Sequence, residues 1–568
     1  MTDTITQPGS PDGQPATAGR SGALPPDWQR RSRRRALTDR LTVGTLALYV
    51  GGLLGLLVLV PTLYLLFVPD AADWSRLTES RFAEASINTA TIGVASTLSA
   101  TFIGFLFAYA LSRADMPGRG VLRVIALLPL ISPPFVVGLA VLLLFGRRGL
   151  ITHELFGQDV SLLGVGGLWL VQSLAFFPLA TLTLLPTLKN IGSTLEWASR
   201  DLGWSWFQTF RRVTLPLAFP SILNALLLVA MFVITDFGNP LLIGGGYRVL
   251  SVEAYVQAVG RQDFGMAAVL CVILFVPTLI LFWIQRRVLR RRTTVTVSGK
   301  TGSLPTMPLP AAVRRVLLAV LGGISVLMVL IYGSILLGSF TQAWGADWSL
   351  TLDHWETALL RADDIRNSAL FASVAAVITT VSTLVAAYVV HRTRVPGRGV
   401  MDGLAVLPAA IPGTMIGVSW LVTFNEPPIA LTGTALILVL VMVVRAIPVG
   451  YRTAVTTINQ ISPSIDEAAT DLGASRLRVL GRIMFPLLGG AFTTSFVFGF
   501  LHAINTLSAV IFLTSPGIGL GAPTIVNLAE FGQWGAATGV AAGLMVVSFA
   551  GLALAKVIFG SRLRMYEL

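Results

Sequence analysis

Two short motifs in the chain begin like the motifs that enzymes use for phosphate and metal chemistry, and both lack a required residue. The sequence Gly-Lys-Thr at 299–301 matches the end of a phosphate-binding loop, but Thr294 stands where the first glycine belongs. The sequence His-Glu at 153–154 begins like a zinc-protease motif, yet Gly157 replaces the second histidine. The chain is therefore not expected to hydrolyse ATP itself or to be an enzyme.

The residue types that most often bind metals are scattered. The four histidines lie far apart in the sequence, which does not suggest a metal cluster. The single cysteine, Cys271, lies within an apolar run, so an internal disulfide and a thiolate metal site are excluded. We expect no metal site and no bound cofactor in this chain.

Two polar loops stand out instead, and they repeat each other 270 positions apart. The first reads Glu-Trp-Ala-Ser-Arg-Asp-Leu-Gly at 196–203, and the second reads Asp-Glu-Ala-Ala-Thr-Asp-Leu-Gly at 466–473. Each lies between very apolar segments. A membrane protein that keeps two copies of one polar loop presents both to the same aqueous partner, so these loops are the candidate functional site.

The composition places the chain in a lipid bilayer. Hydrophobic residues make up 54% of the sequence, charged residues only 12%, and the mean hydropathy is +0.76, which is too apolar for a soluble protein of this length. The net charge of +13 comes from basic residues clustered at the ends of apolar segments. This pattern is typical of membrane orientation rather than nucleic-acid binding, so membrane lipid is an expected partner and nucleic acid is not.

Apolar stretches long enough to cross a hydrocarbon core of ~30 Å recur along the whole chain. Runs of this length favour helices over barrel strands, because a helix satisfies its own backbone hydrogen bonds in lipid. The fold class is therefore predicted to be all-α integral membrane, with about twelve membrane-spanning helices. The predicted spans are 42–67, 88–112, 121–145, 162–186, 218–243, 267–288, 313–339, 367–390, 400–424, 430–455, 487–513 and 536–560.

The basic residues predict the orientation of these spans. Arginines precede the first span, flank the loop after the second and follow the sixth, and alternation through twelve spans puts all three regions on one face. That face is expected to be the cytoplasm, with the spans in a bacterial inner membrane and both termini inside. Residues 1–40, rich in Pro, Gly, Ser and Thr, are expected to be a disordered cytoplasmic tail.

The whole chain repeats itself, not only its polar loops. At an offset of 279 early in the chain and 270 later, many residues recur, for example Pro178 and Pro448. The repeat predicts two tandem six-span halves, 41–289 and 313–568, joined by a cytoplasmic linker at 290–312. Because six is even, both halves have the same topology, so their pseudo-twofold axis runs along the membrane normal and both loops emerge on one side.

Each polar loop is predicted to begin with a short helix. Ser193 precedes Glu196 by three positions, and Ser464 precedes Glu467 by three positions, which is the spacing of a capping box. In such a box the serine side chain caps the helix and the glutamate reaches back to the backbone N–H of the serine. These serines are therefore expected at the helix starts.

The rest of each loop is predicted to complete a helix-turn-helix elbow. Gly203 and Gly473 are expected to end the first helix, because glycine takes up left-handed backbone at little cost. A second, amphipathic helix follows, and Pro216 or Pro486 marks the turn into the next span. The elbows span 193–216 and 464–486, and the apolar positions of their second helices are Phe207, Phe210 and Val213, and Leu477, Leu480 and Ile483.

The elbows resemble those of a known family. The sequence Glu-Ala-Ala at 467–469, with Gly473 six residues after the glutamate, is similar to the EAA loop of permease subunits of binding-protein-dependent ABC importers. Two copies in one chain of this length most resemble the fused ferric-iron permeases. The first copy departs from the pattern, because Trp197 stands where the glutamate of the family would be and Glu196 lies one place earlier.

This resemblance implies a fold of two tandem type I importer permease domains and a set of partners. Two copies of a cytoplasmic ATPase, which use ATP and Mg²⁺, would bind the elbows, and an extracytoplasmic binding protein would deliver the substrate. ATP hydrolysis would take place on that separate subunit. The simpler alternative is that the glutamates and glycines only cap and end helices. The residues expected to couple to the ATPase are Glu196, Ala198, Asp201, Gly203, Glu467, Ala468, Asp471 and Gly473.

Polar residues within spans are the candidates for the transport pathway, because an ionisable group in lipid is costly and usually faces a wet cavity. Asp236 and Asn239 lie in the predicted fifth span, and the matching stretch of the eleventh holds His502 and Asn505. We expect these four residues to line the pathway. The alternative is that Asp236 pairs with Arg445 of the tenth span or is hydrated near the outer surface.

The sequence therefore predicts the permease subunit of an ATP-driven importer, with ferric iron as the expected substrate. Thiamine, phosphonate or a polyamine are alternatives within the same class. The alternative class is a secondary transporter with two parallel six-helix halves, which would transport by itself and would not need two matched elbows.

Overall fold

A computed structural model describes residues 26–113, 115–158, 161–191, 193–290 and 307–560 of the chain. The described helices of the first half are α1 (Pro26–Leu54), α2 (Val60–Leu66), α3 (Ala71–Ser75), α4 (Ser80–Ser112), α5 (Arg119–Ile131), α6 (Pro134–Phe145), α7 (Val165–Asn190), α8 (Ser193–Asp201), α9 (Trp206–Thr209), α10 (Leu215–Ile234), α11 (Gly238–Ile243), α12 (Leu250–Tyr255) and α13 (Phe264–Arg290). Those of the second half are α14 (Ala311–Gly338), α15 (Asp353–Leu360), α16 (Ala362–Arg392), α17 (Arg398–Val406), α18 (Gly413–Thr423), α19 (Ala435–Gln460), α20 (Ser464–Asp471), α21 (Arg476–Val479), α22 (Phe485–Leu487), α23 (Gly489–Ile504), α24 (Gly521–Glu530) and α25 (Trp534–Phe559).

The described residues contain ten helices long and apolar enough to cross a membrane, or twelve if two bent pairs each count as one span. The pairs are Arg398–Ala409 with Gly413–Thr423, bent by 112°, and Arg476–Leu487 with Gly489–Ile504, bent by 74°. Counted this way, six spans fall in each half, as predicted. One small exception to the all-helical prediction is an antiparallel hairpin of β1 (Thr341–Ala343) and β2 (Asp347–Leu350).

Four predicted spans are broken, the third, fifth, ninth and eleventh, and prolines or polar residues mark the breaks. The third, 121–145, divides into α5 and α6 at Ser132, whose backbone is extended because the next residue is Pro133. The fifth and eleventh spans end at Ile234 and Ile504, earlier than predicted. Apolar chain continues beyond both ends as short helices, Gly238–Ile243 after the fifth span and the 3₁₀ helix Val510–Phe512 after the eleventh.

Equivalent long helices form the centre of each half. Helices α4, α7 and α10 pack together in the first half, and α16, α19 and α23 pack together in the second. A Cβ atom on Gly104 would lie 2.5 Å from the Cβ of Ala180, so glycine is required where α4 crosses α7. At the matching crossing of α16 and α19, the glycine is on the other helix: Gly450 faces Thr383. Each half thus has one close helix crossing that contains a glycine. The glycine lies on α4 in the first half and on α19 in the second.

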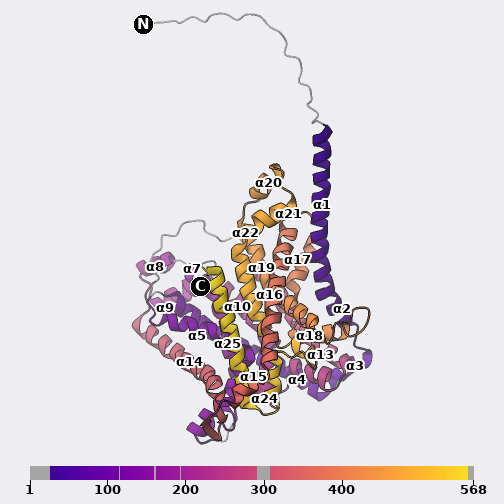
Figure 1. Cartoon of the computed structure of the whole chain (residues 1–568). Helices are drawn as coiled ribbons and strands as arrows, with labels where there is room; N and C mark the ends of the chain where they lie inside the picture. The colour runs from indigo at the N-terminus through magenta and orange to yellow at the C-terminus, as the bar shows by residue number, and fades with distance from the viewer. Residues whose placement is uncertain (1–25, 114, 159–160, 192, 291–306, 561–568) are drawn as a thin grey trace, which may run out of the picture.

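The first span of each half packs on the other half. Helix α1 contacts α16 and α17 of the second half, and α2 contacts α18. Helix α14, which opens the second half, contacts α4, α5 and α6 of the first. Figure 1 shows α1 beside the orange helices of the second half and α14 beside α5.

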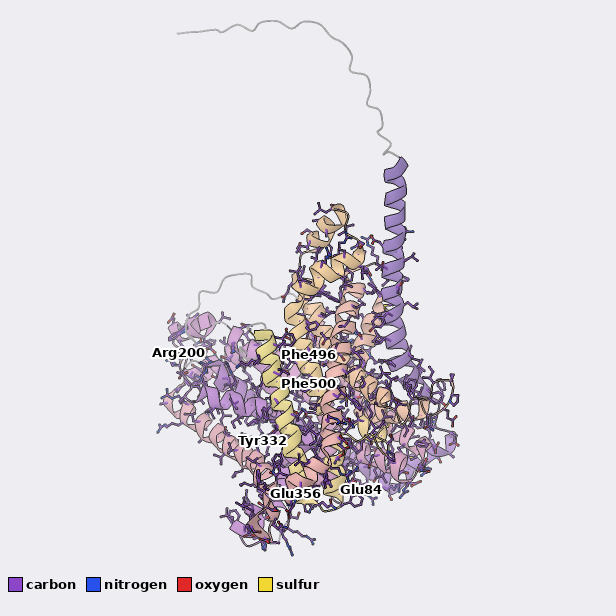
Figure 2. All side chains as sticks on the ribbon, viewed as in Figure 1. Glu84, Arg200, Tyr332, Glu356, Phe496 and Phe500 are labelled. Atoms are coloured by element: carbon purple, nitrogen blue, oxygen red, sulfur yellow. The ribbon has the colours of Figure 1, made fainter. Side chains whose placement is uncertain are left out.

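Both predicted elbows lie at one end of the molecule. Helices α8 and α20 lie at the same end as the start of α1, while α15 and α24 lie at the opposite end (Figure 1). Figure 2 shows the same separation between Arg200 of α8 and the acidic residues Glu84 of α4 and Glu356 of α15. Helix α1 begins at Pro26, within the tail 1–40 that was expected to lack structure. Residues 1–25 and most of the predicted linker lie outside the described residues.

Candidate functional site

Both elbows form the predicted pair of short helices with the predicted glycine between them. Gly203 has φ of 84° and Gly473 has φ of 83°, so both take the left-handed backbone that favours glycine. In the first elbow the N–H of Gly203 donates to Arg200 O at 2.8 Å, and the N–H of Trp204 donates to Ser199 O at 3.1 Å. The second elbow has the same two bonds at equivalent positions. This Schellman pattern confirms how each first helix ends.

The second helices join their spans differently. In the first half Trp206–Ile234 is one continuous helix, which passes through a π-helical turn at Phe210–Thr214. The predicted turn at Pro216 is therefore wrong, because the helix continues through the proline directly after the π-helical turn. In the second half the helix does break, two residues after Pro486.

The predicted capping box of the second elbow is also wrong. Helix α20 has Pro463 at its N-cap and no side-chain capping bond, and Ser464 is already helical. The side chain of Ser193, which belongs to the other predicted box, lies outside the described side chains.

The carboxylate of Glu196 anchors the first elbow. It accepts hydrogen bonds from Arg113 Nη1 at 2.6 Å and Nη2 at 2.8 Å, and from Thr214 Oγ1 at 2.9 Å. Both charged side chains are 4% exposed. Burial alone would lower the pKa of Arg113, but the hydrogen bonds to Glu196 and nearby charges raise it above its ordinary value. Glu196 thus ties α8 to the end of α4 and does not face the solvent.

A looser form of this anchor holds the second elbow. Arg392 lies 3.6 Å from Asp466, and both side chains are 8% exposed. Arg392 Nη2 also donates to the carbonyls of Ile458 (2.7 Å) and Ile461 at the end of α19. Burial raises the pKa of Asp466, and Arg392 opposes that shift.

The two anchors agree with the expected alignment of the elbows. Asp466 occupies the place of Glu196 at an offset of 270, so Glu467 is equivalent to Trp197 and not to Glu196. Glu467 is exposed, whereas Glu196 is buried. Both were predicted to couple to the ATPase, and the burial of Glu196 makes the two carboxylates unequal in exposure.

Most other predicted coupling residues do lie on the surface. Gly473 is partly exposed, and the fully exposed members are Ala198, Asp201, Gly203, Glu467, Ala468 and Asp471. The inner sides of the helices pack on each other: Ser199 bonds to Thr209 at 2.7 Å in the first elbow. Two buried apolar residues, Ala469 and Val479, take these places in the second.

Each elbow also exposes an apolar triad that the sequence reasoning missed. The most exposed members are Leu202 (77%) and Leu472 (90%), which lie at the turns beside the two glycines. Phe207 and Leu477, which were identified as apolar positions of the second helices, are exposed as well. The available signal was the repetition of all three apolar positions at an offset of 270. The triads are Leu195, Leu202 and Phe207 in the first elbow, and Ile465, Leu472 and Leu477 in the second.

Asp236 lies in the break after the fifth span, within a polar cluster. Its Oδ2 accepts hydrogen bonds from Gln172 Nε2 of α7 at 3.1 Å and from Asn239 Nδ2 at 3.0 Å, and Ser251 Oγ donates to its backbone carbonyl at 2.7 Å. Among the described residues Asp236 forms no ion pair, so the alternative pairing with Arg445 is wrong. The amide oxygens of Gln172 and Asn239 are buried and accept no bond from the described residues.

The matching residues of the eleventh span make different contacts. Asn505 Nδ2 donates to the carbonyl of Ile131 at 2.9 Å, which joins the second half to the break in the third span. His502 stacks on Phe498 with ring centroids 5.8 Å apart. The structure thus places Asp236 and Asn239 in one hydrogen-bonded cluster and puts His502 and Asn505 in separate contacts.

Two segments of the chain, residues 100–294 and 383–564, match the family model described as the inner membrane component of binding-protein-dependent transport systems. The chain belongs to this family. Each matched segment falls in one half and contains an elbow together with its arginine anchor. The permease is thus a tandem of two family domains in one chain.

Similar proteins include both fused and single-domain permeases. The ferric transport system permease protein FbpB of Actinobacillus pleuropneumoniae is 34% identical over 473 residues, which cover 81% of this chain and 68% of that protein. The Fe(3+)-transport system permease protein FbpB 2 of Haemophilus influenzae is 24% identical over 88% of this chain and 95% of its own length. The sulfate transport system permease protein CysW of Synechococcus elongatus is 29% identical over 40% of this chain and 81% of its own length.

Proposed function

We propose that this permease carries ferric iron from an extracytoplasmic binding protein into the cytoplasm, driven by a separate ABC ATPase. Two copies of the ATPase dock on the two elbows, hydrolyse ATP with Mg²⁺, and pull the halves between outward-facing and inward-facing shapes. The elbows and both termini then lie on the cytoplasmic side of the inner membrane. The binding protein docks at the opposite end of the molecule.

One observation carries this proposal: both elbows expose the same apolar triad at equivalent positions and at the same end. An exposed apolar patch with a charged rim is typical of a protein–protein contact. Two copies of one patch fit two copies of one partner. The buried anchor at Glu196 makes the first elbow stiff enough to transmit force from that partner to α4, and Arg392 links the second elbow to α16.

The iron assignment is supported by the names of the two ferric permeases that are similar over most of this chain. The cluster around Asp236 agrees with it, because a carboxylate and two unbonded amide oxygens suit a hard cation in passage. We assign Asp236 and Asn239 to the pathway. His502 and Asn505 line the matching position in the second half.

Reconstitution of the chain with its ATPase in lipid vesicles tests the function. Uptake of radiolabelled Fe³⁺ is expected only when the ATPase, ATP with Mg²⁺ and the iron-loaded binding protein are all present. Uptake by the chain alone under an ion gradient would contradict the proposal and identify a secondary transporter. ATP-driven uptake of thiamine, a phosphonate or a polyamine in place of iron would keep the class and correct the substrate.

A further inference from the structure

The second helices of the two elbows begin in different ways. In the first elbow Ser205 and Gln208 form a capping box: Gln208 N donates to Ser205 Oγ at 3.3 Å, and Ser205 N donates to Gln208 Oε1 at 2.9 Å. In the second elbow Arg478 stands in the place of Gln208. A guanidinium only donates hydrogen bonds, so it cannot accept the N–H of Ser475. Accordingly, Ser475 makes no side-chain capping bond.

The missing cap comes from the other half of the chain. Asp39 Oδ1 accepts a hydrogen bond from the backbone N of Arg476, the first residue of α21, at 3.0 Å. Asp39 belongs to α1, whose later turns contact α16 and α17. A carboxylate at a helix start satisfies a backbone N–H that has no partner within the helix, and its charge complements the helix dipole.

Helix α1 also packs against α21, and beside this contact the two elements are separated by an open groove. A cavity of about 950 Å³ lies between them, lined by Asp39 and Val43 of α1 and by Glu467, Asp471 and Arg476 of the elbow. The bond from Asp39 therefore spans the edge of an open groove. The second elbow also has the looser of the two arginine anchors, at 3.6 Å against 2.6 Å.

We propose that Asp39 is a positioning residue that holds the second elbow through an inter-half helix cap, while the first elbow caps itself. Displacement of the second elbow is then passed to α1 as well as to α16. The first elbow has its own capping box and its bidentate anchor. This inference rests on the proposed coupling function, because it assigns a route for the movement that the ATPase imposes.

Hydrogen exchange of the full chain tests the cap without the ATPase. Asp39→Ala is expected to speed exchange of the amides of residues 476–478 about fivefold, the change expected for loss of one helix cap. Asp39→Asn keeps an acceptor oxygen and is expected to keep exchange slow. Thr45→Ala is the matched control on α1, because Thr45 Oγ1 bonds only to Leu41 O of its own helix. Unchanged exchange in Asp39→Ala would overturn the proposal.

A rescue separates capping from a general effect on folding. Arg478→Gln rebuilds in the second elbow the box that Ser205 and Gln208 form in the first. Asp39→Ala with Arg478→Gln is therefore expected to restore slow exchange of the amide of residue 478, which the rebuilt box would bond, while the amide of Arg476 stays fast. Failure of this rescue would also overturn the proposal.

Transport assays on the complete complex then measure the consequence of the cap. Asp39→Ala is expected to lower iron uptake per ATP hydrolysed relative to Thr45→Ala, and Arg478→Gln should restore it. If Asp39→Ala speeds hydrogen exchange but leaves iron uptake per ATP hydrolysed unchanged, Asp39 caps the helix but has no positioning role in transport, and the proposal is overturned. Absence of ATPase binding in the unaltered chain would instead contradict the proposed function, so the two failures are distinguishable.

Discussion

Arg113 and Glu196 form a bidentate, buried ion pair that joins the end of α4 to the first helix of the first elbow. The equivalent pair in the second half, Arg392 and Asp466, is 1 Å longer and shares its arginine with backbone carbonyls. The two elbows therefore differ in how firmly they are held, although they expose matching surfaces.

Glu196→Gln is expected to destabilise the permease by about 3 kcal/mol, because it leaves the charge of Arg113 buried without its counter-ion. Thermal unfolding of the purified protein in detergent measures this as a lower midpoint. A double-mutant cycle with Arg113→Gln checks the cause. Additive effects of the two changes would contradict a direct interaction.

Asp466→Asn is expected to leave stability unchanged or slightly higher at pH 7. The folded pKa of Asp466 is raised, so its ionised form is less favourable in the folded state than in the unfolded state. The neutral asparagine removes that cost, and Arg392 keeps its bonds to backbone carbonyls. Any advantage of the variant should shrink near pH 4, where the carboxyl of the unfolded chain protonates. A loss of stability as large as that of Glu196→Gln would show that the two anchors are equivalent.

Leu202→Asp and Leu472→Asp are each expected to weaken ATPase binding by about tenfold, because a charge at the centre of an apolar contact is poorly tolerated. Folding should be unaffected, since both side chains are exposed. Copurification with the ATPase measures the effect. Leu360→Asp is the matched control, because Leu360 is 85% exposed on α15 at the opposite end. Equal binding by all three variants would exclude the triads as docking surfaces.

Asp236→Asn is expected to reduce iron uptake severalfold while membrane insertion and ATPase binding stay normal. The change keeps the size of the side chain but removes the charge that two amides hold in place. Thr235→Ala is the control, since Thr235 Oγ1 bonds to carbonyls of its own helix. Uptake by Asp236→Asn equal to that of the control would remove Asp236 from the pathway.

The sequence predicted the parts of the site that local chemistry determines. Gly203 and Gly473 were recognisable because few other residues take up left-handed backbone, and the repeat located both elbows. The anchor at Glu196 was not predicted, because the spacing of Glu196 from Ser193 suggested a capping box. Its partner, Arg113, lies 83 residues earlier, and no local sequence pattern predicts that contact.

The spans were predicted from hydropathy, which shows how long an apolar segment is but not whether its helix is straight. The break at Ser132 separates two helices that are both apolar on average, so the run 121–145 resembles one crossing. The same holds beyond Ile234 and Ile504. Asp39 is the clearest case of information missing from local sequence, because the helix it caps lies 437 residues away.

The first span of each half packs on the other half, and these contacts hold the two halves together. Since α2 lies on α18 and α14 lies on α6, a chain cleaved between Arg290 and Met307 would yield two fragments that remain associated through interlocked helices. The peptide connection between the halves then serves mainly to fix their one-to-one stoichiometry during synthesis. Coexpression of the two fragments as separate polypeptides should give an intact heterodimer.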